Sequence, residues 1–424
     1  MGLTFVTRST VKWPSIFVFL VMLFIAETQM NNGFTIWAEA SAASVQSILV
    51  GGPLFAALTA WQTGSILRSP IREQLVLAQD QGYKAWVQIY LGNLFWASAT
   101  YLSVVLLIHM QLLGRASWGS PTWIWISSSV VAMALHVAFG LLAGFISSGF
   151  LAPLITATAM YVLDGALLVT NSNPLTYLSP GYSQVQEVAF GINFLMLEFQ
   201  AVWYLGAALV VLTLASFYIQ GSTKKKLASL AMGLFIATVG VLGISINPGF
   251  FVFTHSSWNP LCEGEPVICV HPAFEFQESE INKALSPTVR HIDGTAFGGS
   301  RYTWTNRGVL GLPRQGEIAW HLDGLNGSWK QEMRRELATD LLTPGSESGG
   351  PCEGFPPTSQ FAYSSLGSIV VNWISEEPNL FRGVAKFDSK AASQFDGYTE
   401  SQKKHWLDQN VEKICDGSIS ASDF

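Results

Sequence analysis

The sequence predicts a multi-pass α-helical membrane protein with about seven spans, followed by a mainly helical α+β domain outside the cytoplasm. Three observations lead to this fold class: a low and uneven charge content, long apolar stretches, and cysteines confined to one end of the chain. Only 12% of the 424 residues are charged, against about 25% in an ordinary soluble protein. The mean hydropathy is accordingly positive, at +0.33.

The charged residues divide the chain into two parts near Pro248. Residues 1–250 contain 16 of the 52 Asp, Glu, Lys and Arg residues, so 36 fall in the last 174. We therefore predict a transmembrane domain over 1–248 and a soluble domain over 249–424. The net charge of −6 provides no basic excess, which argues against nucleic acid as a partner.

Several stretches of the first part are long and apolar enough to cross a bilayer. A helix needs about 20 apolar residues to span about 30 Å of hydrocarbon, and only helices or closed barrels satisfy their backbone groups there. The first stretch follows basic residues, as a signal peptide does, but the later stretches favour an uncleaved first helix. The predicted spans are roughly 13–30, 45–64, 87–112, 122–144, 150–170, 190–217 and 227–246.

Lysine and arginine in the short loops predict the orientation. Short cytoplasmic loops carry an excess of these residues. With alternating spans, eight of them fall on one side, whereas the opposite loops contain only Arg115. This pattern places the N-terminus in the cytoplasm and the C-terminal domain outside. The eight residues are Arg8, Lys12, Arg68, Arg72, Lys84, Lys224, Lys225 and Lys226.

All four cysteines lie in the soluble part: Cys262, Cys269, Cys352 and Cys415. An even number in one soluble domain indicates two disulfides in an oxidising compartment, and we favour the pairs 262–269 and 352–415. Four free buried thiols are the alternative. The spacing does not match the paired Cys-x2–4-Cys of zinc modules. The compartment that disulfides require agrees with the orientation that the loop charges predict.

The soluble domain contains helical patterns but no recognisable catalytic motif. We expect helices over 279–285, 328–342, 361–374 and 401–414, a short strand over 267–270, and N-caps at Ser389 and Thr399. Neither His-Glu-x-x-His nor Gly-x-Ser-x-Gly occurs. His321 and Asp323 could belong to a triad, but no nucleophile motif accompanies them. We therefore expect a protein that is not an enzyme.

The segment between the second and third spans is polar and longer than a hairpin loop. It extends from Ser65 to Trp86 and has apolar residues at near-helical spacing. Pro70 suits the first turn of a helix, with Ser69 as its N-cap. We predict a short amphipathic helix on the cytoplasmic side, which either joins two spans or docks a partner.

This segment resembles the cytoplasmic loop of type-2 ABC exporter permeases, through Arg68, Ser69, Pro70, Ile71, Arg72 and Glu73. The resemblance covers about residues 1–220 and implies that the 68–84 helix docks a separate ATPase subunit. It also implies a homodimer or heterodimer of permeases in the lipid bilayer, with no cofactor in this chain. No Gly-x4-Gly-Lys-Ser/Thr motif occurs, so ATP would be bound by the partner. The seventh span and the external domain depart from the family pattern.

The outer stretch between the fifth and sixth spans and the carboxylates within the spans each allow a functional and a structural interpretation. The resemblance implies a re-entrant stretch on the outer side at Thr170–Val188, where an ordinary loop is the alternative. Asp164 and Glu198 are carboxylates within predicted spans, which usually face protein or water. They would line a transport path, or serve packing only; Glu198 has the third alternative of lying near water on the outer side. His109 and His136 have no partner at metal-ligand spacing, and we expect both to be structural.

The leading functional hypothesis is therefore a membrane-spanning permease subunit of an ATP-driven ABC export system. One alternative is a non-transporting membrane anchor that displays an external binding, sensing or immunity domain. Another is an external enzyme on a membrane stalk. Seven spans exceed what an anchor or a stalk needs, which favours the permease.

Overall fold

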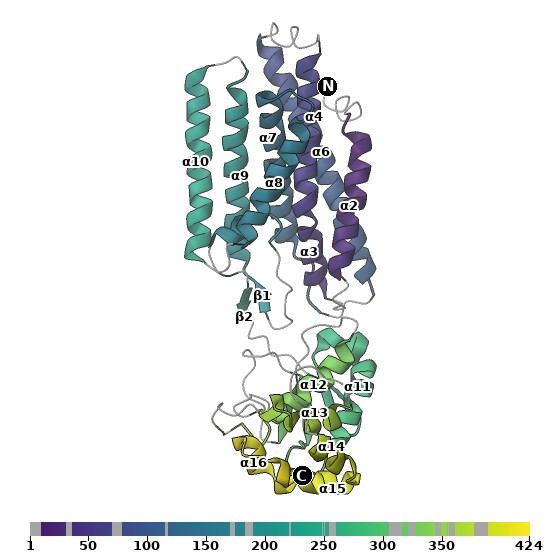
Figure 1. Cartoon of the computed structure of the whole chain (residues 1–424). Coiled ribbons are helices and arrows are strands. Elements are labelled where there is room, and N and C mark those ends of the chain that lie inside the picture. Colours follow the sequence, from purple (N-terminus) through teal and green to yellow (C-terminus); the bar gives the residue numbers. More distant parts are fainter. Residues whose placement is uncertain are drawn as a thin grey trace.

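The computed structural model of the chain contains a bundle of long helices and a smaller part with helices and a sheet (Figure 1). Seven helices of the described chain are long and apolar enough to cross a membrane. The predicted class of a mostly helical chain with seven apolar helices and a few strands is thus confirmed. The structure describes residues 10–30, 36–69, 79–114, 118–169, 174–182, 190–219, 222–247, 249, 251–253, 260–304, 316–320, 328–343, 349–353, 355, 361–376 and 389–424.

The bundle differs from the predicted spans in three places. The helix of the third predicted span begins at Gln79 rather than at 87. The second apolar stretch extends over Trp37–Arg68 rather than 45–64, because the Ala- and Ser-rich segment before residue 45 is also helical. The sixth helix begins at Phe194, because residues 190–192 form a strand and Asn193 then caps the helix by accepting from the Met196 N–H at 3.1 Å. The bundle helices are α2 (Lys12–Met30), α3 (Trp37–Gln46), α4 (Ile48–Arg68), α6 (Gln79–Leu112), α7 (Trp123–Ile146), α8 (Ala152–Val169), α9 (Phe194–Ser216) and α10 (Thr223–Ile246).

Small residues allow the bundle helices to approach closely. At Gly206 of α9, a methyl group would lie only 2.2 Å from the backbone nitrogen of Ala237 in α10. Between helices in lipid, the burial of apolar side chains supplies little driving force. Close van der Waals packing of small residues holds such helices together instead. The α9–α10 pair is therefore packed backbone against backbone.

The two ends of the bundle differ. The C-terminal end of α4 and the α9–α10 connection lie at one end, and the smaller part of the molecule lies beyond the other end (Figure 1). Arg68 ends α4 and Lys224–Lys226 begin α10. The basic residues of both segments therefore gather at the end remote from the cysteines.

Strands and short helices make up the smaller part. A two-stranded antiparallel ladder joins β1 (Phe190–Ile192), before α9, to β2 (Phe251–Phe253), after α10. A four-stranded sheet has the order β3-β4-β5-β6, with β3 antiparallel to β4 and the other pairs parallel. The strands of this sheet are β3 (Leu261–Glu263), β4 (Ile268–Val270), β5 (Arg301–Trp304) and β6 (Glu317–Trp320).

Helices cover this sheet and complete one hydrophobic core. The predicted helix at 279–285 continues to Ile292 despite Pro287, because its apolar face stays buried along the whole length. Residues 361–374 and 401–414 each divide into two helical segments. Thr399 is confirmed as an N-cap, whereas Ser389 is itself the first helical residue. The main helices are α11 (Glu278–Ile292), α12 (Trp329–Leu341), α13 (Gly367–Ser375), α14 (Ser389–Asp396), α15 (Glu400–Gln409) and α16 (Val411–Asp416).

Two residues adjoining the bundle helices enter the core of the smaller part. Ile36, just before α3, and Trp118, before α7, form an isolated β-bridge. Ile36 is buried in this core and Trp118 packs against it. The Trp118 ring meets the His271 ring edge-on at a centroid distance of 4.5 Å. We call these three residues the joint, because they connect the two parts of the molecule.

Candidate functional site

The cysteines form the two predicted pairs. Cys262 and Cys269 face each other in the β3–β4 ladder, and their sulfurs are at disulfide distance. Cys352 and Cys415 are also at disulfide distance and bring together segments 63 residues apart. The Arg301 guanidinium donates to both sulfurs of the first pair, at 2.8 and 2.9 Å. These cysteines are structural cross-links of the smaller part.

The predicted docking segment, residues 68–84, is described at its two ends only: residues 68 and 69 close α4, and residues 79–84 belong to the beginning of α6 rather than to a separate helix. Arg68 is the last residue of α4, and its guanidinium donates to the Ser65 hydroxyl at 3.3 Å. Ser69 follows as the C-cap, and its hydroxyl donates to the Ile66 carbonyl at 2.7 Å. The other four predicted docking residues, Pro70, Ile71, Arg72 and Glu73, lie outside the described residues.

Asp164 lies inside the bundle and is paired with a histidine. It is 3% exposed, and its Oδ2 lies 3.0 Å from Nε2 of His136, which is fully buried. Asp164 comes from α8 and His136 from α7, which adjoin in sequence through a short turn. The pair thus joins two neighbouring helices within the apolar bundle.

The hydrogen-bond partners of His136 determine which atoms of the pair hold protons. Nδ1 of His136 lies 2.9 Å from the Ala132 carbonyl oxygen. A carbonyl only accepts, so Nδ1 must hold a hydrogen. The Nε2–Oδ2 contact then contains one further proton, either on the imidazolium or on the carboxylic acid. In both arrangements the pair is neutral overall, which lowers the cost of burying it away from water.

Other buried polar groups are linked to the backbone of Asp164 by hydrogen bonds. The Ser179 hydroxyl donates to the backbone carbonyl of Asp164 at 3.2 Å. Gln200 donates to the Tyr177 carbonyl at 2.7 Å and accepts from the Ser128 hydroxyl at 3.4 Å. We call Ser128, His136, Asp164, Ser179 and Gln200 the buried polar cluster. Its members come from α7, α8, α9 and the 3-10 turn η1 (Pro174–Leu178) with the residue after it.

The imidazole fits closely against a third helix. A methyl group added to Gly52 of α4 would lie 2.6 Å from His136 Nε2. The side chain of His136 therefore occupies the space that a larger residue at position 52 would need. This contact fixes the ring beside Asp164, so that α4, α7 and α8 all position the pair.

The structure does not bring Glu198 to this cluster as a buried partner. The Glu198 side chain is exposed on α9, whereas Asp164 is enclosed. The two carboxylates predicted to line one path therefore occupy different environments. Within Thr170–Val188, only residues 174–182 are described; they form η1 and a turn beside the cluster.

His109 has packing partners rather than a carboxylate. Its ring stacks between Trp37 and Trp123, with centroid distances of 6.0 and 6.2 Å. Its Nδ1 donates to the Val105 carbonyl at 2.8 Å, and its Nε2 lies 3.2 Å from the Ser41 hydroxyl. This arrangement suits the structural role expected for His109.

Sequence reasoning missed two features of the bundle. It treated His136 as unpaired, although His136 and Asp164 lie at similar distances from the turn of a helical hairpin, where residues face each other. It also left out Glu39, because the segment before residue 45 was not predicted to be helical. Glu39 is 3% exposed, and neither of its carboxylate oxygens has a hydrogen-bond partner in the described chain.

No group of three or more His, Cys, Asp or Glu residues with metal-binding geometry occurs among the described residues. What the buried polar cluster offers chemically is an exchangeable proton between two side chains within an apolar bundle. In membrane proteins, ionisable residues within the spanning helices commonly mark ion or substrate pathways. Comparison of the chain with protein-family models, with curated proteins and with solved structures found no match.

Proposed function

We propose that this chain is the membrane-spanning permease subunit of an ATP-driven export system. The N-terminus would lie in the cytoplasm and the cysteine-bearing part outside. The chain would pair with a second permease, either a copy of itself or a sister chain. A separate ATPase would dock on the cytoplasmic segment that begins at Arg68.

The observation that carries this proposal is the buried His136–Asp164 pair. Apolar side chains would fill the same volume without the desolvation cost of an ionisable pair. An anchor has no need of such a pair, whereas a transporter needs polar groups where solute or protons pass. The exposed carboxylate of Glu198 would serve a different purpose or none.

The distribution of basic residues supports the proposed orientation. Arg68 and Lys224–Lys226 belong to segments at the end of the bundle remote from the disulfides. Basic residues favour the cytoplasmic side, and disulfides favour an oxidising compartment. Both preferences are met when the bundle crosses the membrane with that end inside.

The test is to purify the tagged full chain from its native membranes and to identify what accompanies it. We expect a nucleotide-binding chain with a phosphate-binding loop, present in stoichiometric amount, and ATP hydrolysis by the complex. The Arg68→Glu/Arg72→Glu variant should lose this chain, because the docking surface reverses its charge. The matched control, Lys224→Glu/Lys225→Glu, alters another basic segment of the same end and should retain it.

A third variant tests the buried pair separately from docking. Asp164→Asn should still bind the ATPase but should change the rate of ATP hydrolysis, because the pair lies in the proposed path. The absence of any nucleotide-binding partner, even after chemical cross-linking in the membrane, would contradict the proposal. It would favour an anchor that displays an external domain.

A further inference from the structure

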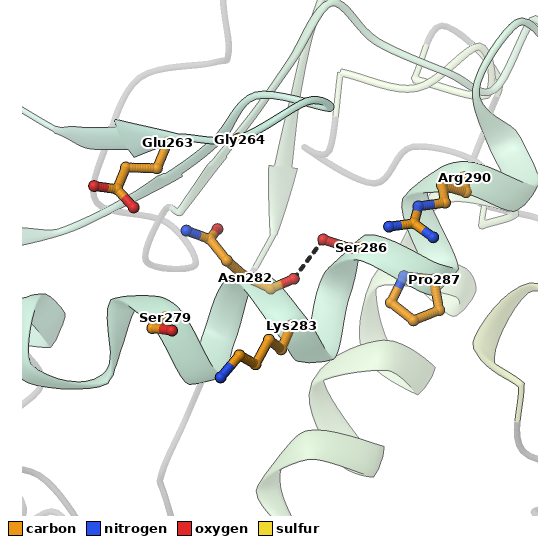
Figure 2. Close-up of a pocket in the computed structure, with 8 residues that line it drawn as sticks. All are labelled: Glu263, Gly264, Ser279, Asn282, Lys283, Ser286, Pro287 and Arg290. Carbon is orange, nitrogen blue, oxygen red and sulfur yellow. Dashed lines mark hydrogen bonds between the residues drawn. The ribbon is translucent and has the colours of Figure 1, made fainter.

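The smaller part of the molecule contains a polar pocket between the β3–β4 hairpin and α11 (Figure 2). Its volume is about 360 Å³, at the lower end of the range for small-ligand sites. Glu263 and Gly264 of the hairpin form one wall. The polar face of α11 forms the other wall. The pocket lies outside the bundle, so its role does not depend on the proposed transport.

Both walls of the pocket are held firmly in place. The opposite face of α11 is buried in the core through Ile281, Leu285 and Val289, all at 0% exposure. The hairpin is cross-linked by the Cys262–Cys269 pair directly beside Glu263. A pre-formed site loses little freedom when it binds a ligand, so this geometry favours binding.

The pocket has one acidic and one basic end, and Lys283 also lines it, with its Nζ 3.9 Å from the Glu280 carboxylate. Figure 2 shows Glu263 at one end and Arg290 at the other, with Asn282 between them. Neither the Glu263 nor the Arg290 side chain makes an ion pair or hydrogen bond with the described part of the chain. Two further carboxyl groups lie near Glu263: burial, and then the Glu263 and Glu275 carboxylates, raise the pKa of Glu278.

Between the charged ends, α11 presents two acceptors, a side-chain oxygen without a donor and a backbone carbonyl without its usual helical donor. Oδ1 of Asn282 is buried and has no hydrogen-bond partner among the described residues. Pro287 lies inside the helix and has no N–H, so the Lys283 carbonyl lacks its usual helical donor. Both groups therefore call for N–H or O–H donors from a ligand.

We propose that this pocket binds a short peptide with free ends. The ammonium group would face Glu263, the carboxylate would face Arg290, and backbone N–H groups would donate to Asn282 and the Lys283 carbonyl. Residues 279 to 290 of α11 extend over about 16 Å at the helical rise, which matches an extended tetrapeptide or pentapeptide. A nucleotide or other polyanion is disfavoured by the acidic end, and an uncharged sugar would leave both charges unpaired.

The test uses tetra-alanine as the probe and the full chain in detergent micelles, with binding followed by saturation-transfer NMR. Three forms are compared: free ends, N-acetylated and C-amidated. We expect each capped form to bind about tenfold more weakly, because charge-assisted hydrogen bonds are lost. Phosphoethanolamine, a zwitterion without peptide N–H groups, should also bind more weakly than tetra-alanine.

Two variants assign the ends of the ligand. Arg290→Gln should bind the free and the C-amidated peptide equally, and Glu263→Gln should bind the free and the N-acetylated peptide equally. The controls Arg335→Gln and Glu412→Gln remove like charges outside the pocket and should keep both preferences.

Two outcomes would overturn the assignment. One is the absence of saturable binding up to about 10 mM tetra-alanine. The other is binding that Arg290→Gln and Glu263→Gln leave unchanged. A preference for phosphoethanolamine over the peptide would equally overturn it, since a lipid headgroup would then be the better ligand.

Discussion

The bundle and the smaller part each contain a histidine paired with carboxylates, but in opposite surroundings. In the bundle, His136 and Asp164 are enclosed, at 0% and 4% side-chain exposure. In the smaller part, His291 lies 2.6 Å from Glu400 and 3.2 Å from Glu376, whose side chains are about half exposed. The two sites share their chemistry and differ in their access to water.

This difference decides what each pair contributes. At the surface, water and ions screen the charges, and an ion pair is worth about 0–1 kcal/mol. In the bundle nothing replaces a lost partner, so removal of one member leaves a polar group buried alone. A strong dependence of one partner on the other is therefore expected only within the bundle.

The largest predicted effect follows from breaking the buried pair. Asp164→Leu should lower the free energy of unfolding by about 3–5 kcal/mol, because it leaves the His136 imidazole without its partner. The double variant His136→Leu/Asp164→Leu should recover much of this loss. With His136→Leu as the third variant, reversible unfolding of the detergent-solubilised chain would measure all three differences and the coupling between them.

Glu400→Gln is the matched control in the smaller part. It removes one carboxylate from His291 and should cost no more than about 1 kcal/mol. Equal losses for Asp164→Leu and Glu400→Gln, or losses that simply add in the bundle, would contradict the comparison. The pair would then be a packing feature without electrostatic coupling.

The second prediction concerns the cross-links, which are confined to the smaller part. The Cys352–Cys415 pair closes 63 residues and the Cys262–Cys269 pair closes seven. On the chain-entropy model, the longer loop stabilises by about 4 kcal/mol and the shorter by about 2.5 kcal/mol. Cys352→Ser/Cys415→Ser should therefore lower the melting temperature more than Cys262→Ser/Cys269→Ser.

Near-ultraviolet circular dichroism, with and without reductant, would follow this loss in each variant. The variant in which all four cysteines are replaced is the control. Reductant should have no effect on it, because the bundle contains no further cysteine. A larger loss from the shorter loop would show that local contacts, such as those of Arg301 with both sulfurs, outweigh chain entropy.

The features that the sequence predicted well are those governed by composition and chain-local geometry. The apolar helices follow from length and hydropathy, and the Cys262–Cys269 hairpin follows from close spacing. The cap at Thr399 follows from its side-chain chemistry together with Gln402. In each of these cases the residues that interact are neighbours in sequence or share one periodic pattern.

The features that it missed depend on contacts between helices. The difference between exposed Glu198 and buried Asp164 depends on how α9 and α8 face their neighbours, which hydropathy along one helix does not contain. The joint forms because Ile36 and Trp118, which are far apart in sequence, meet each other and the core of the smaller part. The His136–Asp164 pair was accessible in principle, because the fourth and fifth predicted spans are consecutive and antiparallel, but neither span alone shows which of its faces meets the other.

The smallest predicted effect concerns the joint, where the two parts of the molecule meet. His271 is 2% exposed and packs edge-on against Trp118 and Trp304. Its Nδ1 accepts a hydrogen bond from the Ala273 N–H at 3.1 Å, so that nitrogen must be unprotonated. Burial lowers the pKa of His271 from 6.5 to about 4.

This shift makes the joint sensitive to acid. Above pH 6.5 His271 is neutral in both the folded and the unfolded chain, and the contribution is fully present. As the pH falls from 6.5 towards 4, only the unfolded chain takes up the proton, so stability is lost progressively. The loss should reach about 2 kcal/mol at pH 5.

His271→Asn keeps an acceptor for Ala273 but does not titrate, so its stability should fall less over the same range. Unfolding of both chains at pH 7.5 and pH 5, followed by tryptophan fluorescence, would measure the difference. An equal acid loss in the two chains would place the pH sensitivity elsewhere, and His271 would then contribute to the joint only through packing.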